Sequence, residues 1–256
     1  MTQIRNEMGI ILKSPREVAQ MRDAGRVAAA VLEEVAKKVR PGVTTVELDA
    51  VAVNEVKKRG AVASFKGYRG FPASICTSVN EEVVHGIPGN RILREGDIVS
   101  LDVGAILNGF HGDAAITVEV GEVGDEATRL LMVTEGALSA GIAAARHGSR
   151  LGDVSAAIQD HVESKGFTVV REYVGHGIGR QMHEEPQIPN FGRPGDGPEL
   201  KKGMTLALEP MVNIGDWHTR VGSDHWVVLT ADGSLSAHFE NTIAITNSKP
   251  EVLTAL

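Results

Sequence analysis

Four acidic residues interrupt segments that otherwise have the apolar pattern of β-strands. Asp102 lies in VSLDVG, Asp113 in NGFHGD, Glu209 in LALEP and Glu240 in AHFENTIAIT. A carboxylate in such a strand is costly to bury unless a cation, a proton or water compensates it. A solvated strand face can explain any one of these acids, but it explains all four poorly. We therefore treat them as candidate metal ligands.

The first two acids flank Asn108-Gly109, a dipeptide that favours the two positive φ angles of a two-residue hairpin turn. With this turn, Asp102 faces Ala115 and Asp113 faces Gly104. The two carboxylates then point to the same face of the sheet, one diagonal step apart, roughly 7–8 Å between Cα atoms. The sequence thus predicts that both can reach one ion.

A glycine-rich segment, GHGIGRQMHEEP, starts at Gly175 and contains His176 and His183. Its spacing matches neither a GxGxxG dinucleotide loop nor an HExxH zinc helix. One imidazole with four carboxylates is an oxygen-rich donor set that suits Mn²⁺, Fe²⁺, Co²⁺ or Zn²⁺. Four acids exceed the needs of one ion, and bridging acids would hold two ions roughly 3.5–4 Å apart, as in two-metal hydrolysis. Strand alternation leaves His111 and His238 open as further ligands.

Capping residues and apolar spacing predict the elements that position these side chains. We expect helices over residues 14–40, 44–60, 125–146 and about 149–166, with strands and turns over 61–120 and after residue 167. The last strands should form a hairpin over roughly 225–246 that turns at Asp232-Gly233.

The two halves of the chain also resemble each other. Residues 40–60 match 146–166 without a gap, and residues 95–102 match 202–209, which makes Asp102 and Glu209 equivalent. We expect one catalytic domain over residues 1–256 with an internal repeat of about 14–120 and 125–246. The predicted class is α+β: an antiparallel sheet core with helices outside, and the acids near a pseudo-twofold axis.

Composition restricts the other functions that the protein could have. The 256 residues are 42% hydrophobic and carry a net charge of −7, which argues against a surface that coats nucleic acid. The single cysteine, Cys76, excludes an intramolecular disulfide and a thiolate-rich metal site, and fits a reducing compartment. No apolar run is long enough to span a bilayer, and the N-terminus lacks a signal-peptide pattern. We therefore expect a cytoplasmic protein.

These residues, together with His85 in VVHGIPG and His183 in MHEEP, closely resemble type 1 methionine aminopeptidases. The resemblance extends from about Ile11 to Thr246. It implies the duplicated pita-bread fold, in agreement with the repeat. It also implies a metallo-exopeptidase that removes the N-terminal methionine from nascent peptides and proteins, preferably when the second residue is small.

The resemblance assigns a role to each site residue. It makes Asp102, Asp113, His176, Glu209 and Glu240 the ligands of two divalent ions (Co, Mn, Fe or Zn), with Asp113 and Glu240 bridging. A water activated by both metals would attack the scissile carbonyl, with Glu209 also accepting a proton. His85 and His183 would contact the substrate and stabilise the tetrahedral intermediate. The methionine pocket would be lined by Phe65, Tyr68, Phe71, Cys76, Met182 and Trp226, although plain core packing explains Cys76 and Met182 nearly as well.

Other proteins with this fold agree less well with the sequence. Proline-specific peptidases usually carry an additional N-terminal domain, for which little chain precedes the first expected helix. Type 2 methionine enzymes have a helical insertion, and the segment between His183 and Glu209 leaves little space for one. A non-catalytic binding protein would typically have lost ligands. The expected partners are peptide N-termini and, transiently, the ribosome. We expect a monomer with no nucleic-acid specificity and no membrane contact.

Overall fold

The computed structural model describes residues 4–5 and 9–255, so the ends of the expected domain and part of the N-terminal stretch lie outside the described residues. Four long helices are present: α1 (Pro15–Ala36), α2 (Thr45–Lys58), α3 (Asp125–Ala144) and α4 (Leu151–Glu163). A 3₁₀ turn, η1 (Tyr68–Gly70), lies in the first half. The strands are β1 (Ile4–Arg5), β2 (Ile11–Leu12), β3 (Val62–Ala63), β4 (Cys76–Val79), β5 (Glu82–Val84), β6 (Ile98–Leu107), β7 (Phe110–Glu119), β8 (Thr168–Val169), β9 (Gly175–Gly177), β10 (Glu184–Ile188), β11 (Thr205–Leu208), β12 (Met211–Asn213), β13 (Thr219–Val221), β14 (Val228–Thr230), β15 (Ser236–His238), β16 (Glu240–Ala244) and β17 (Glu251–Val252).

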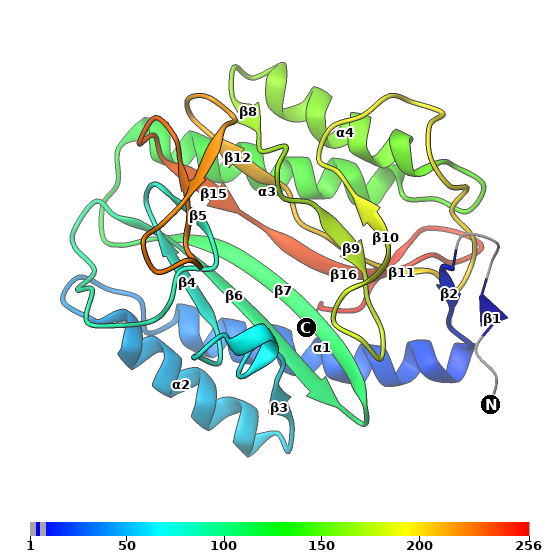
Figure 1. Ribbon diagram of the computed structural model, residues 1–256, viewed down its shortest axis with the longest axis horizontal. Helices are drawn as coiled ribbons and strands as arrows, with labels where there is room; N and C mark the ends of the chain where they lie inside the picture. Colours follow the sequence, from blue (N-terminus) through cyan, green and yellow to red (C-terminus); the bar gives the residue numbers. More distant parts are fainter. Residues whose placement is uncertain (1–3, 6–8, 256) are drawn as a thin grey trace.

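A nine-stranded sheet forms the centre of the molecule, with the helices outside it (Figure 1). Its main path runs β10-β9-β11-β16-β7-β6-β3, and β4 and β17 join at the sides. The pair β16·β7 connects the two halves of the chain, and all pairings between the described strands are antiparallel. This arrangement confirms the predicted α+β architecture. No helix in the described part of the chain is long and apolar enough to cross a membrane.

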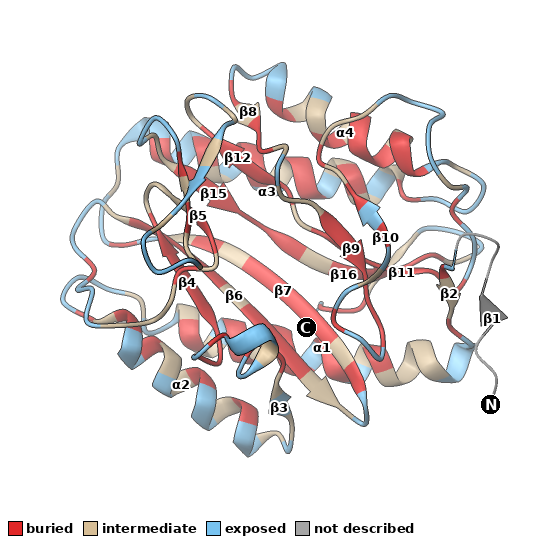
Figure 2. Ribbon diagram, in the orientation of Figure 1, coloured by how far each residue is buried: buried red, intermediate tan, exposed pale blue. Residues whose placement is uncertain are grey.

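Each helix pair covers its own half of the sheet. Helices α1 and α2 bury Val31, Leu32 and Leu48 against β6 and its neighbours. Helices α3 and α4 bury Leu130 and Ile158 against the strands of the second half. Figure 2 shows the resulting pattern, in which the strands are mostly buried and the outer faces of the helices are exposed. Each half therefore has its own apolar core between its helices and the sheet.

The predicted helix starts are largely correct, and the predicted ends are less so. Ser14 caps α1 with a complete capping box, as expected. However, α1 ends at Ala36 rather than near Pro41, because the next residues form tighter turns, in which Lys38 N donates to Val35 O and Val39 N to Ala36 O. Helix α3 is capped by Gly124 instead of Asp125 and ends at Ala144.

The hairpin β6–β7 has the predicted register. Asp102 pairs with Ala115 and Gly104 with Asp113. Asn108 and Gly109 have φ angles of 53° and 77°, the two positive values that the turn requires. The local sequence thus predicted the register that relates the two aspartates.

The predicted last hairpin is wrong. Strand β14 pairs with β13 and β5, whereas β15 pairs with β12 and β16 with β11, β7 and β17. The Asp232 carboxylate accepts hydrogen bonds from the backbone N–H groups of Ser234 and Asp216, so Asp232-Gly233 belongs to a wider loop. This loop carries the chain from one small sheet to another instead of reversing it.

Candidate metal centre and substrate cavity

Four side chains form a row across the sheet on one face. Cys76 on β4 pairs with Asp102 on β6, which pairs with Ala115 on β7, which pairs with Glu240 on β16. Directly paired residues of antiparallel strands project to the same side. Ala115 is 1% exposed and places only a methyl group between the two acids. The register therefore opens a space between Asp102 and Glu240.

Two other candidate ligands, Asp113 and His176, lie in the adjacent row. Asp113 pairs with Gly104, and His176 on β9 pairs with Ala207 on β11. Thr242 fixes the backbone of Asp113, since its Oγ1 accepts a hydrogen bond from Asp113 N at 3.0 Å and donates one to Asp113 O at 2.9 Å. Small residues thus alternate with acids and an imidazole in both rows.

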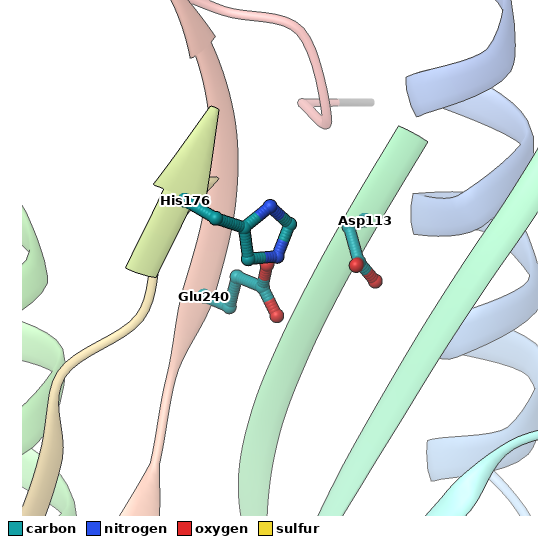
Figure 3. Close-up of side chains that lie close together, drawn as sticks. All are labelled: Asp113, His176 and Glu240. Atoms are coloured by element: carbon teal, nitrogen blue, oxygen red, sulfur yellow. The ribbon is translucent and has the colours of Figure 1, made fainter. Parts of the chain in front are cut away.

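Three of the candidate ligands converge in Figure 3: Asp113 from β7, His176 from β9 and Glu240 from β16. One donor atom from each lies within 4.8 Å of the other two. His176 Nδ1 lies 2.9 Å from Gly177 O, and the carbonyl can only accept, so Nδ1 carries the proton and Nε2 is free to bind an ion. Nε2 also lies 3.5 Å from Glu209 Oε1, at the end of β11.

Several oxygens of these buried carboxylates have no hydrogen-bond partner in the described part of the chain. Among the described residues, Asp102 Oδ1, Asp113 Oδ1 and Glu240 Oε1 have no hydrogen-bond partner. Burial raises the pKa of Asp113 to about 7, and burial together with the neighbouring acids raises the pKa values of Asp102, Glu209 and Glu240 well above their usual range. Burial lowers the pKa of His176 to about 3, so its ring is neutral. Unpaired buried oxygens beside a neutral imidazole fit a divalent cation.

One cavity contains all thirteen residues that the sequence singled out as site residues. Its acidic end is formed by Asp102, Asp113, His176, Glu209 and Glu240, and the rest of its wall includes Phe65, Tyr68, Phe71, Cys76, Met182, His85, His183 and Trp226. In the apolar part, the Phe71 ring lies edge-on to Phe65 at 6.5 Å and to Trp226 at 5.2 Å. Burial raises the pKa of the Cys76 thiol, so it stays neutral. An apolar pocket therefore opens directly onto the acids.

Two imidazoles border the acidic end of the cavity. The His183 ring lies 4.2 Å from that of His176, and its Nδ1 is 2.8 Å from the Tyr68 hydroxyl. His85 has a φ of 63° and faces the Tyr173 ring at 6.0 Å. Burial lowers the pKa of both histidines, that of His85 to about 4. Both rings are therefore neutral at pH 7, and each offers one donor and one acceptor nitrogen.

A buried ion pair holds the segment that carries His183. Lys13 Nζ lies 2.5 Å from Glu184 Oε2, and both side chains are 3% exposed. The other oxygen of Glu184 accepts a hydrogen bond from Gln181 N at 3.2 Å. Gly179 leaves room for this pair, because a Cβ there would lie 2.6 Å from both side chains. The glycine-rich segment is thus tied to the chain just before α1.

The two histidines that alternation left open do not line this cavity. His111 Nδ1 lies 2.9 Å from Ser64 Oγ. His238 is 2% exposed, and its Nε2 lies 3.9 Å from an oxygen of both Glu209 and Glu240 without a hydrogen bond to any described residue. Neither histidine therefore contributes to the wall of the cavity, although His238 lies close to two of the acids.

Sequence reasoning missed four residues of the cavity wall: Arg69, Val84, Tyr173 and Val174. Each is next to or within two residues of a predicted site residue or of the glycine-rich segment. Their proximity along the chain was the available signal, but no pattern of residue types distinguished them.

Comparisons with known proteins agree with this geometry. Residues 19–247 match the model of metallopeptidase family M24. Methionine aminopeptidase 1 of Bacillus subtilis is 55% identical over 245 residues, covering 96% of this chain and 99% of that protein. The methionine aminopeptidase of Clostridium acetobutylicum is 54% identical over 246 residues, covering 96% of this chain and 98% of that protein.

Solved structures give the same result for the fold. The crystal structure of methionine aminopeptidase from Thermotoga maritima has a TM-score of 0.95 at 50% identity, with 96% of this chain and all of that chain covered. The prolidase of Pyrococcus furiosus has a TM-score of 0.77 at 20% identity, covering 96% of this chain and 65% of that one, which shows a shared fold alone. The pita-bread fold expected from the sequence is therefore confirmed.

Proposed function

Because the chain belongs to metallopeptidase family M24, we propose that it is a metal-dependent aminopeptidase that removes N-terminal methionine from peptides and proteins. The observation that carries this proposal is the junction of an aromatic, apolar pocket with a set of buried, unpaired carboxylates in one cavity. The proline-specific alternative is disfavoured, since the prolidase shares only 20% of its residues with this chain.

We propose that Asp102, Asp113, His176, Glu209 and Glu240 hold two divalent ions, with Asp113 and Glu240 shared between them. Support comes from the proximity of the Asp113, His176 and Glu240 donor atoms and from the unpaired oxygens around them. Co²⁺, Mn²⁺, Fe²⁺ and Zn²⁺ suit this donor set. When bound, such ions lower the pKa of water and polarise a carbonyl.

Side chains of the cavity bind the substrate, accept a proton and stabilise developing charge. The pocket around Phe71, Cys76 and Trp226 takes the methionine side chain, since soft, apolar walls suit a thioether. Glu209 accepts the proton, because its carboxylate lies at the acidic end of the cavity, with Oε1 3.5 Å from His176 Nε2. His85 and His183 are neutral and can donate hydrogen bonds to the oxygen on which negative charge develops.

The resemblance of the sequence also supports a natural substrate and setting. We propose that the substrates are nascent proteins whose second residue is small. We further propose that the enzyme acts as a cytoplasmic monomer with transient ribosome contact.

A direct assay tests the main proposal. Metal-free protein is supplied with Mn²⁺, Co²⁺, Fe²⁺ or Zn²⁺ and given Met-Ala-Ser or Ala-Pro, and free amino acids are measured. We expect methionine release from Met-Ala-Ser and no cleavage of Ala-Pro. Failure to cleave the methionyl peptide with every ion would refute the proposal, whereas cleavage of Ala-Pro alone would favour a proline-specific enzyme.

A further inference from the structure

Tyr68 belongs to a turn that the backbone holds firmly. The turn η1 includes Arg69 at a φ of 48° and ends at the positive-φ Gly70, and another positive-φ glycine, Gly67, precedes it. Four backbone hydrogen bonds close it: Gly67 N to Phe71 O, Tyr68 N to Phe65 O, Gly70 N to Gly67 O and Phe71 N to Tyr68 O. The side chain of Tyr68 therefore projects from a fixed point of the cavity wall.

The Tyr68 side chain contacts His183 in two ways. Its hydroxyl oxygen lies 2.8 Å from His183 Nδ1, and the two rings stack with centroids 5.3 Å apart at 22°. The Arg69 guanidinium lies over the Tyr68 ring, 5.4 Å from its centroid. Tyr68 thus lines the apolar pocket and also places its hydroxyl oxygen next to Nδ1 of His183 in the candidate active site.

This contact bears on which nitrogen of His183 carries the proton. A neutral imidazole has one N–H donor and one acceptor nitrogen, and the partner of the first nitrogen fixes the role of the second. If the Tyr68 hydroxyl donates to Nδ1, Nε2 carries the hydrogen and can donate to a substrate oxygen. If Nδ1–H donates to the Tyr68 oxygen instead, Nε2 can only accept.

We propose that Tyr68 is a positioning residue that donates its hydroxyl hydrogen to His183 Nδ1 and thereby keeps Nε2–H as the donor toward the scissile carbonyl. The direction of donation rests on the proposed function, in which His183 stabilises negative charge on that oxygen. The stacked ring adds an orientation constraint, because it holds the imidazole plane nearly parallel to the phenol.

The test compares Tyr68→Phe, which keeps the ring and loses the hydroxyl, with Thr128→Val, which removes an exposed hydroxyl outside the cavity. Histidine ¹⁵N shifts are recorded on Zn²⁺-loaded protein, and a His183→Gln variant identifies the His183 signals. We expect Nε2–H in the parent enzyme and in Thr128→Val, and a mixture of tautomers in Tyr68→Phe. We also expect kcat on Met-Ala-Ser to fall by about tenfold to a hundredfold in Tyr68→Phe, with KM changed less than about twofold.

Several results would overturn the inference. A proton on Nδ1 of the parent His183 would reverse the direction of the hydrogen bond. Unchanged ring shifts in Tyr68→Phe, or a rise in KM with kcat unchanged, would reduce Tyr68 to a pocket wall. If the parent enzyme fails to release methionine while the shifts respond as expected, the proposed function fails and the hydrogen-bond assignment stands.

Discussion

The two halves of the molecule share a backbone frame but carry different side-chain segments. In the first half, Gly42 N donates to Leu93 O at 2.8 Å, and in the second, Gly148 N donates to Leu200 O at 2.9 Å. The next bonds also correspond: Leu93 N to Val43 O and Leu200 N to Ser149 O, then Thr45 N to Arg91 O and Leu151 N to Pro198 O. These bonds, which we call the shared frame, support the predicted internal repeat.

The halves differ in the segments after their second helix. The first half builds the turn around Tyr68 and the strand that carries Cys76, and so supplies most of the apolar pocket. The second half builds β9 and β10 and supplies His176 and His183. Each half contributes acids to the centre, but the aromatic pocket comes mainly from the first half, whereas His176 and His183 come from the second half and His85 from the first. A repeated frame can thus place acids symmetrically while unequal loops supply the specificity.

We expect the largest effect on metal content and activity from substituting Asp113, an acid at the junction of the two halves. Asp113 comes from the first half and faces His176 and Glu240 of the second. We expect Asp113→Ala to lose at least one ion per chain and about 10³-fold or more of kcat/KM, some 4 kcal/mol of transition-state stabilisation. Metal analysis and the Met-Ala-Ser assay measure both effects, with the exposed Asp160→Ala as control. Near-normal turnover in added Mn²⁺ or Co²⁺ would refute a bridging role.

Substitutions of Ala115 test whether metal binding needs the space between Asp102 and Glu240. Leucine at this position would fill the gap in the row between Asp102 and Glu240, whereas glycine would keep it. We expect Ala115→Leu to lower metal affinity and kcat/KM by about a hundredfold or more, and Ala115→Gly to stay within about tenfold of the parent. Circular dichroism checks that both variants fold. Equal metal binding by the two variants would show that the size of residue 115 does not limit metal binding.

The sequence was sufficient to predict the structure where a local pattern of residues fixes the geometry. Asn108-Gly109 sets the β6–β7 register and hence the relation of Asp102 to Asp113. The capping box at Ser14 sets the start of α1. These features depend on a few adjacent residues, so tertiary contacts had little opportunity to override them.

Sequence was insufficient where partners lie far apart along the chain. Asp232-Gly233 has the composition of a hairpin turn, yet the strands around it pair with distant segments. The bond between Tyr68 and His183 joins two segments by tertiary folding, and no spacing rule predicts it. Alternation likewise left His111 and His238 open as ligands, and the folded structure shows that neither lines the cavity.

The pH dependence of stability without metal should report the free-energy cost of burying ionised carboxylates where the two halves meet. The folded-state pKa of Asp113, about 7, lies above its ordinary 3.8, so its stabilising proton is lost as pH rises through 7. Buried His176 and His85, with lowered pKa values, oppose this trend only below about pH 6.5. We expect the Tm of chelator-treated protein to fall by about 4 °C or more between about pH 6.5 and about pH 8.5.

Metal should cancel this trend, because ligation requires the deprotonated carboxylates and grows stronger as pH rises. Differential scanning fluorimetry with and without Zn²⁺ measures both curves. A Tm that rises with pH in the metal-free protein would show that the acids are compensated by groups of the protein itself.

The smallest effect concerns the shared frame. Gly42 and Gly148 have φ angles of 89° and 84°, and a Cβ at either position would meet nothing within 4 Å. Alanine there adds only backbone strain, so Gly42→Ala and Gly148→Ala should each lower the free energy of unfolding by about 1 kcal/mol and leave kcat unchanged. Gly203→Ala should cost more, because its Cβ would lie 2.7 Å from Lys13 O. Urea denaturation measures the free energy of unfolding of the three variants. Clearly unequal losses in Gly42→Ala and Gly148→Ala would mean that the two halves of the shared frame have matching hydrogen bonds but different stabilities.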